Sequence, residues 1–468
     1  MKNFMLACPK PDRLPLLVSS RLSMASPSIE PSLLRVVPRW QLVGLSINDV
    51  IGSGIYLLPA AVAALLGNAS TLAVIAAGLA VALLVLCFAE ASSYFDEPGG
   101  AYVYTREAFG DFVGFEVGWM TWLARIASIA SLANGFALAT AYLWPAAATG
   151  FTRVALITVT LGILTGINVV GVKKGAGAAV AFTILKLVPV VFFVLVGIFF
   201  VDWSHVSKIN LPPTSTFGEA ALLLLFAYAG FENLPAAAGE YKNPRRDIPF
   251  ALLTMIVTVT LLYTLVQVVA LGTLPGLEKS TSPLAEAAAR FAGGGAALLL
   301  TVGAMVSIVG NISNTTLMGP RYLFALAQDG YGPKQLARVH PHYRTPANAI
   351  FALMAIALIL ALTGSFVQLA LLSIVARLTT YIGTAAAVPI LRRRFAGRPG
   401  VLRLPGGATI PIAALIVCLV FLASTQMRNL IAGAIALAIG AVIYTYRRPG
   451  RSNVNSHLTM PESPQTKR

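Results

Sequence analysis

Residues 49–59 read Asp-Val-Ile-Gly-Ser-Gly-Ile-Tyr-Leu-Leu-Pro and lie inside the first long apolar segment of the chain. Gly52 and Gly54 flank Ser53, where a membrane helix needs residues that hold helical geometry. Glycine is the weakest ordinary helix former, and it lets other groups approach the backbone closely. A helix that breaks at membrane depth leaves N–H and C=O groups that lipid cannot pair. The stretch therefore predicts a broken membrane helix whose break lines a cavity or binds a solute.

The composition around this stretch is that of an integral membrane protein. Of the 468 residues, 57% are hydrophobic and 11% are charged, whereas a soluble domain carries about 25% charged residues. A membrane helix needs about 20 mostly apolar residues. We predict one all-α transmembrane domain at 38–446 with twelve spans, and disordered cytoplasmic tails at 1–37 and 447–468. The spans cover approximately 41–66, 70–94, 112–144, 152–171, 178–201, 217–239, 249–273, 296–325, 347–364, 367–391, 408–425 and 429–446.

The basic residues predict how the chain is oriented. The net charge is +16, which in a soluble protein would suggest nucleic acid. When the N-terminus is placed in the cytoplasm, most lysines and arginines fall in the inner loops and tails. The positive-inside rule explains this asymmetry. We therefore expect a multi-pass protein of the cell membrane (plasma or inner membrane) with both termini in the cytoplasm, a lipid bilayer as its surroundings and no nucleic-acid partner.

A second interruption is expected in the sixth span, which reads Phe-Ala-Tyr-Ala-Gly-Phe-Glu-Asn-Leu-Pro over residues 226–235. Gly230 and Pro235 disfavour a continuous helix there, and the charge of Glu232 is costly at membrane depth. Paired broken helices at corresponding positions of two halves mark the solute site of secondary transporters. We predict an inverted five-plus-five repeat from these breaks and from the hydropathy, without residue-level similarity between the halves. The predicted repeats are 41–201 and 217–391, and extra helices follow at 408–446.

Cysteine and histidine give no sign of a catalytic or metal site. The three cysteines and four histidines show no spacing typical of a disulfide framework or of metal ligands. No combination of His, Cys and Asp predicts nucleophilic or acid–base chemistry. The sequence therefore indicates a protein that is not an enzyme and needs no cofactor.

Three motifs resemble the amino acid–polyamine–organocation (APC) superfamily of transporters. Ile-Gly-Ser-Gly-Ile-Tyr at 51–56 resembles its first-helix motif. Residues 226–232, followed by Gly-Glu-Tyr-Lys-Asn-Pro-Arg-Arg-Asp-Ile-Pro at 239–249, resemble its sixth helix and the loop after it. Residues 99–110 resemble the loop after its second helix. The motifs occur in order within about 38–446, and they imply an amino acid permease of the proton-coupled type. The implied fold is LeuT-like, with five-plus-five helices and two extra C-terminal helices.

The resemblance also implies which residues contact the substrate. Half-helix N-termini suit an anion, and unwound carbonyl groups suit a cation. The alternative reading of the glycines is close packing between helices. The resemblance assigns the substrate carboxylate to Ile51, Gly52, Ser53 and Gly54, the ammonium group to the carbonyls of Phe226, Ala227 and Ala229, and a gate over the substrate to the Phe226 ring.

Two charged residues within spans are candidates for energy coupling. A charge at membrane depth is costly and needs a partner or a role. The resemblance implies that Lys186 occupies the place where sodium-coupled relatives bind sodium, and a desolvated lysine titrates readily. The alternative is that Lys186 reaches the nearer interface with its long side chain. Glu232 matches a carboxylate of the family's sixth helix, and it either couples to protons or bridges helices.

Three further charged residues within the spans bear on the site. Asp49 departs from the family pattern, in which the residue before the motif is small or apolar. Its carboxylate could pair with Lys186 or Arg125, titrate as a third coupling group, bind a cationic substrate or face a vestibule. Arg125 and Arg377 are expected to organise internal polar networks rather than to contact the substrate.

The function expected from these features is secondary active amino acid transport by alternating access, with protons as the symported ion. The alternatives within this class are an amino acid exchanger and a polyamine transporter. The alternative outside it is a membrane solute sensor that does not transport. The substrate, protons and lipid bilayer are the expected partners.

Overall fold

The structure is a computed structural model, and it describes residues 37–97, 99–170, 175–207 and 214–447. These residues form helices joined by turns, with an isolated bridge between Val37 and Tyr241 as the β pairing among them. The all-helical fold class expected from the sequence is confirmed for this part of the chain. The tails predicted at 1–37 and 447–468 lie outside the described residues, apart from Val37 and Arg447.

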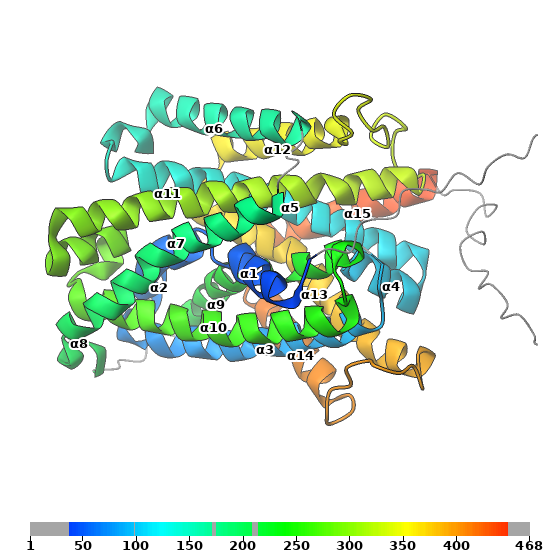
Figure 1. The fold of residues 1–468 in the computed structure, drawn as a ribbon, viewed down its shortest axis with the longest axis horizontal. Helices are drawn as coiled ribbons and strands as arrows, with labels where there is room; N and C mark the ends of the chain where they lie inside the picture. The colour runs from blue at the N-terminus through cyan, green and yellow to red at the C-terminus, as the bar shows by residue number, and fades with distance from the viewer. Residues whose placement is uncertain (1–36, 98, 171–174, 208–213, 448–468) are drawn as a thin grey trace, which may run out of the picture. The chain divides into compact units, whose positions relative to one another are not determined.

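Figure 1 shows the helices in chain order. The α-helices are α1 (Arg39–Val50), α2 (Gly54–Leu66), α3 (Ser70–Ser93), α4 (Ala101–Phe109), α5 (Asp111–Ala141), α6 (Gly150–Val170), α7 (Gly175–Gly197), α8 (Trp203–Ser207), α9 (Thr214–Tyr228), α10 (Pro244–Thr273), α11 (Pro283–Gln328), α12 (Ala347–Thr363), α13 (Phe366–Arg394), α14 (Thr409–Ala423) and α15 (Met427–Arg447). The 3₁₀ segments are η1 (Gly67–Ala69), η2 (Pro145–Ala148), η3 (Ile198–Phe200), η4 (Phe231–Glu240) and η5 (Leu277–Lys279).

The helices have the length and composition of membrane helices. Within the described residues, eight segments are long and apolar enough to cross a bilayer, and shorter apolar helices accompany them at Ile184–Phe200, Ala347–Thr363 and Thr409–Ala423. Large apolar side chains such as Leu79, Leu195 and Ile359 are exposed on the outer helices, where lipid would cover them. Each of the twelve predicted spans contains helical residues. Twelve crossings stay a prediction.

The eighth predicted span differs most from the structure. We predicted residues 296–325, but α11 runs from Pro283 to Gln328. Its first part is set off by Gly293, whose φ of +78° interrupts the helical geometry. Positive φ is a conformation that glycine adopts without strain. The three consecutive glycines at 293–295 lower the apolar signal there, so the sequence pattern marked the helix only after the kink.

The packing brings the two interrupted helices together. Helix α1 packs against α7, α10, η4 and α11, and α2 packs against α9. Helix α5 packs against both α11 and α13. Figure 1 shows α1 near the centre of the view, with α11 above it and α10 below it. The ends of α1 and α9 therefore meet among helices that come from distant parts of the chain.

Candidate functional site

The first helix break lies between α1 and α2, at the glycines that predicted it. Helix α1 ends at Val50 and α2 begins at Gly54. A Cβ atom on Gly54 would lie 2.9 Å from the Cα atom of Ala227, so the two backbones could not approach as they do. A Cβ atom on Gly52 would meet Nδ2 of Asn311 at 2.7 Å, and that side chain can rotate away. Of these two glycines, Gly54 is the one that allows close contact with the second broken helix.

Lys186 of α7 binds the free end of α1. Its Nζ atom donates hydrogen bonds to the carbonyl oxygens of Asn48 at 2.6 Å and Ile51 at 2.7 Å. The side chain is 1% exposed, so the alternative in which Lys186 reaches the membrane interface is wrong. A cation at a helix C-terminus is favoured by the helix dipole. Lys186 therefore satisfies backbone acceptors that the break leaves without helical partners.

Side chains of α10 and α11 pair with the other carbonyl groups of this break. Backbone acceptors buried away from water need such partners, because an unpaired one costs free energy. Asn311 Nδ2 donates to the Asp49 carbonyl at 3.0 Å, the Tyr263 hydroxyl to Val50 at 3.3 Å, and the Ser307 hydroxyl to Ile51 and Gly52 at 3.4 and 3.5 Å.

The start of α2 carries free hydrogen-bond donors. The N–H groups of Tyr56 and Leu57 bond to the carbonyl of Ser53. In the described part of the chain, no acceptor pairs with the N–H groups of residues 52–55. Unpaired N–H groups and the positive end of the helix dipole make a helix N-terminus an anion-binding site. The break can therefore hold a carboxylate.

The second break lies between α9 and η4 and touches the first. Helix α9 ends at Tyr228, Gly230 has a φ of +132°, and η4 begins at Phe231. A Cβ atom on Gly230 would lie 2.5 Å from the carbonyl oxygen of Asp49. Only glycine satisfies both the backbone conformation and this approach.

The backbone carbonyls near the second break keep acceptor capacity. The Phe226 carbonyl accepts from the Ala229 N–H group at 3.2 Å, and the Ala227 carbonyl accepts from the Tyr263 hydroxyl at 2.9 Å. A carbonyl oxygen has two lone pairs, so each can accept a further donor. Spare acceptor capacity on backbone carbonyls is what an ammonium group requires.

A pocket of about 30 Å³ lies between the two breaks. Six of the seven residues that the resemblance assigns to the substrate line it. The seventh, Ile51, is not among the lining residues, and its carbonyl accepts a hydrogen bond from Lys186. A space of this size holds roughly two water molecules, so an amino acid requires movement of the surrounding groups. The Phe226 ring packs edge-on against Phe366, with ring centroids 6.1 Å apart. The pocket is lined by Val50, Gly52, Ser53, Gly54, Ser128, Leu132, Phe226, Ala227, Ala229, Asn311 and Arg377.

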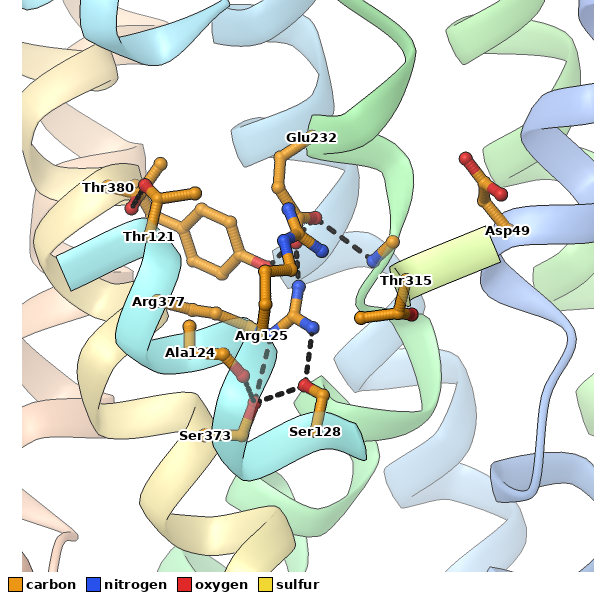
Figure 2. A network of polar contacts seen from close by, with 12 residues as sticks. Asp49, Thr121, Ala124, Arg125, Ser128, Glu232, Thr315, Ser373, Arg377 and Thr380 are labelled. Carbon is orange, nitrogen blue, oxygen red and sulfur yellow. Dashed lines mark hydrogen bonds and ion pairs between the residues drawn. The ribbon is translucent and has the colours of Figure 1, made fainter. Parts of the chain in front are cut away.

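Glu232 joins three helical segments beside this pocket (Figure 2). Its carboxylate pairs with Arg125 of α5 at 3.3 Å and with Arg377 of α13. Its Oε2 atom accepts from the Gly230 N–H group at 3.0 Å and from the Tyr381 hydroxyl at 3.3 Å. Glu232 therefore bridges helices, and the two arginines organise an internal polar network as the sequence predicted. A role of Glu232 in proton coupling stays a prediction.

Arg377 has two further contacts that sequence reasoning missed. Its Nη2 atom donates to Ser128 Oγ at 2.8 Å and its Nε atom to Ser373 Oγ at 3.2 Å. Both Arg377 and Ser128 line the pocket. We expected Arg377 to serve the network without contacting the substrate. The signal that could have found it is an arginine near the middle of the tenth predicted span, where a charge needs a partner or a role.

Asp49 is held by an asparagine. Its carboxylate accepts a hydrogen bond from Asn314 Nδ2, and among the described residues it forms no ion pair with Lys186 or Arg125. Figure 2 shows Asp49 apart from the cluster around Glu232. In place of the ion pair with Lys186 or Arg125 that we considered from the sequence, Asp49 forms a hydrogen bond that joins α1 to α11.

Comparison with known proteins gives one family and several relatives over nearly the full chain. A family model described as amino acid permease matches residues 38–451. The methylthioribose transporter of Bacillus subtilis is 28% identical, over 90% of this chain and 95% of its own length. The serine/threonine exchanger SteT of the same organism is 31% identical, over 85% and 92%. Its branched-chain amino acid permease BcaP is 28% identical, over 92% and 97%.

Proposed function

The chain belongs to the amino acid permease family, and from this membership we propose that it moves an amino acid across the cell membrane by alternating access, coupled to protons. The relatives named above are transporters, and the chain is a transporter rather than an enzyme. The relatives' names give different substrates and modes. The substrate and the coupling must therefore be argued from the site.

The observation that carries the proposal is the meeting of two broken helices at one polar pocket. The free N–H groups of residues 52–55 hold the substrate carboxylate, and Ile51 begins the unwound segment that carries them. The carbonyls of Phe226, Ala227 and Ala229 hold the ammonium group. The Phe226 ring closes over the bound substrate. Opposite backbone charges on two sides of one pocket suit a zwitterion.

The proposed architecture has twelve crossings with both termini in the cytoplasm. Residues 41–201 and 217–391 form two repeats of opposite orientation, followed by two extra helices at 408–446. The breaks in the first and sixth predicted spans support this arrangement, because they fall at corresponding positions of the two repeats. The distribution of basic residues supports the orientation.

The proposed coupling runs through Lys186. Its amine occupies the end of α1 with two backbone carbonyls as ligands, the kind of acceptor set that a metal cation would otherwise need. Loss or gain of a proton there changes the charge at the break without removing the hydrogen-bonding group. Asp49 is the carboxyl group proposed to exchange that proton. The sequence offers Glu232 as a second coupling group, but its ion pairs with Arg125 and Arg377 favour a fixed bridge between helices.

Uptake of radiolabelled amino acids into proteoliposomes tests the proposal. An imposed pH gradient should drive accumulation, and a sodium gradient alone should not. Accumulation that follows sodium and ignores pH would remove Lys186 from the coupling. A polyamine included in the substrate set tests the other alternative.

Amino acid exchange is the second candidate, because one relative is named an exchanger. It predicts uptake only into vesicles preloaded with an amino acid, with no accumulation under a pH gradient. Counterflow measured beside gradient-driven uptake in the same preparation separates the two modes.

A further inference from the structure

The network beside the pocket carries more positive than negative charge. Arg125 and Arg377 share the single carboxylate of Glu232. The next carboxylate, Asp49, interacts electrostatically with Lys186 as well as with Arg125, so the three cations of the two breaks still outnumber the two carboxylates. Guanidinium groups keep their proton in proteins, so protonation of a coupling group cannot remove the excess. Protonation of Glu232 would increase it. Among the described residues, the other titratable group in contact with Glu232 is the Tyr381 hydroxyl, which donates a hydrogen bond to the carboxylate and brings no negative charge.

This excess lies where charge is costly. The side chains of Arg125, Glu232 and Arg377 are 1%, 2% and 6% exposed. A buried cation without a partner anion is strongly unfavourable, and within a membrane protein such a residue marks a pathway or a binding site. The structure therefore points to an anion that completes the network.

Arg377 is the arginine that such an anion can reach. It lines the pocket, whereas Arg125 is not among the lining residues and has its guanidinium carbon 6.0 Å from the centre of the Tyr322 ring. In the described part of the chain, the contacts of Arg377 with Glu232, Ser128 and Ser373 use three of its five N–H groups. Donors remain for a ligand in the pocket.

We infer that the substrate is an amino acid with an acidic side chain, and that Arg377 binds the side-chain carboxylate beside Ser128. The inference rests on the proposed function, in which the two breaks take the α-carboxylate and the ammonium group. A second carboxylate is then the group that balances the arginines. A neutral substrate leaves the excess charge in place, and a cationic one adds to it. The paired donors of a guanidinium group match the two oxygens of a carboxylate.

Ranking of substrates by the unaltered full-length protein is the first test. Binding of radiolabelled L-glutamate and L-aspartate is competed with glutamine, asparagine, serine, leucine and lysine. An acidic amino acid should bind at least about 10-fold more tightly than its own amide. A site that has a buried partner for a polar or charged group binds an analogue without that group poorly. Equal or tighter binding of the amides, serine or leucine overturns the inference and leaves the proposed function standing. Failure of every amino acid to bind and to be transported overturns both.

The variant Arg377→Gln tests the assignment to Arg377. It leaves Arg125 and Glu232 as a balanced pair, so the fold should persist. The preference for the acid over its amide should disappear, while binding of the amide is kept. The matched control is Arg153→Gln, because Arg153 contacts Asn134 and the carbonyls of Ala361 and Gly364 and does not line the pocket. It should keep the ranking of the unaltered protein.

An unchanged ranking in Arg377→Gln overturns the assignment. If Arg377→Gln does not fold, Ser128→Ala replaces it, since this change keeps every charge. It should weaken binding of the acidic amino acids more than binding of their amides. Equal weakening of both overturns the assignment.

Discussion

The two helix breaks meet at one pocket but are stabilised in different ways. At the end of α1, one ammonium group lies against backbone carbonyls, so a cation faces dipoles. At the start of η4, one carboxylate lies between two guanidinium groups, so formal charges face each other. A neutral amine at Lys186 could still donate hydrogen bonds. A neutral Glu232 would leave two buried cations without a counter-ion.

This difference suits the two breaks to different roles in the transport cycle. The first break tolerates a change of charge, which suits a step that follows proton movement. The second break does not, which suits a fixed connection between η4, α5 and α13. The proposal for Lys186 and the inference for Arg377 follow from this contrast, and variants that change one break at a time test it.

The largest loss of stability is expected for Glu232→Gln. Removal of one partner from a buried ion pair costs about 3–5 kcal/mol, and here two arginines lose the same partner. Thermal unfolding of purified protein in detergent measures the loss, and size-exclusion chromatography reports whether the variant stays monodisperse. Arg377→Gln is the control, because it removes a charge and leaves a balanced pair. Equal destabilisation by both variants would contradict the unequal charge count at the second break.

The sequence predicted the breaks because their causes are local. Gly52, Gly54 and Gly230 disfavour helix wherever they occur in a long apolar segment, so both interruptions could be found without a structure. The assigned substrate residues follow the same local motifs, and six of them line one pocket.

The partners of the buried charges could not be found in the same way. Lys186 contacts carbonyls more than 130 residues earlier in the chain, and Arg377 contacts Ser128 across 249 residues. Which face of a helix meets which neighbour depends on packing between helices, and single-sequence patterns do not contain this information. The position of Arg377 at the pocket, and its excess charge beside Glu232, therefore required the structure.

Enlargement of Gly54 should have the next largest effect. Gly54→Leu places a side chain where a Cβ atom already lies 2.9 Å from the Ala227 backbone, and overpacking of this kind costs about 1–3 kcal/mol. Substrate binding, measured with the radiolabelled ligand, should be lost because the two breaks separate. Gly52→Ala is the milder comparison, since its neighbour is the movable Asn311 side chain. Normal affinity in Gly54→Leu would mean that the glycine serves packing only.

Lys186→Ala should destabilise the protein less than Glu232→Gln does. It should impair gradient-driven transport more than it impairs substrate binding. The carbonyls of Asn48 and Ile51 lose their donor, but the Ser307 hydroxyl still reaches Ile51, so we expect a loss of about 1–3 kcal/mol. Uptake driven by a pH gradient should disappear, while equilibrium binding of substrate is reduced but measurable. Unchanged gradient-driven uptake would show that the amine is a structural partner of α1 without a role in coupling.

Asp49→Asn should have the smallest effect on stability and separates the two roles of the first break. The amide oxygen can still accept the hydrogen bond from Asn314, so the free energy of unfolding should change by less than about 1 kcal/mol. The amide cannot carry a proton. If Asp49 exchanges protons with Lys186, the variant loses accumulation under a pH gradient and keeps counterflow between preloaded vesicles and medium. Full accumulation under the gradient would leave Lys186 as the titrating group of this break and reduce Asp49 to a contact between α1 and α11.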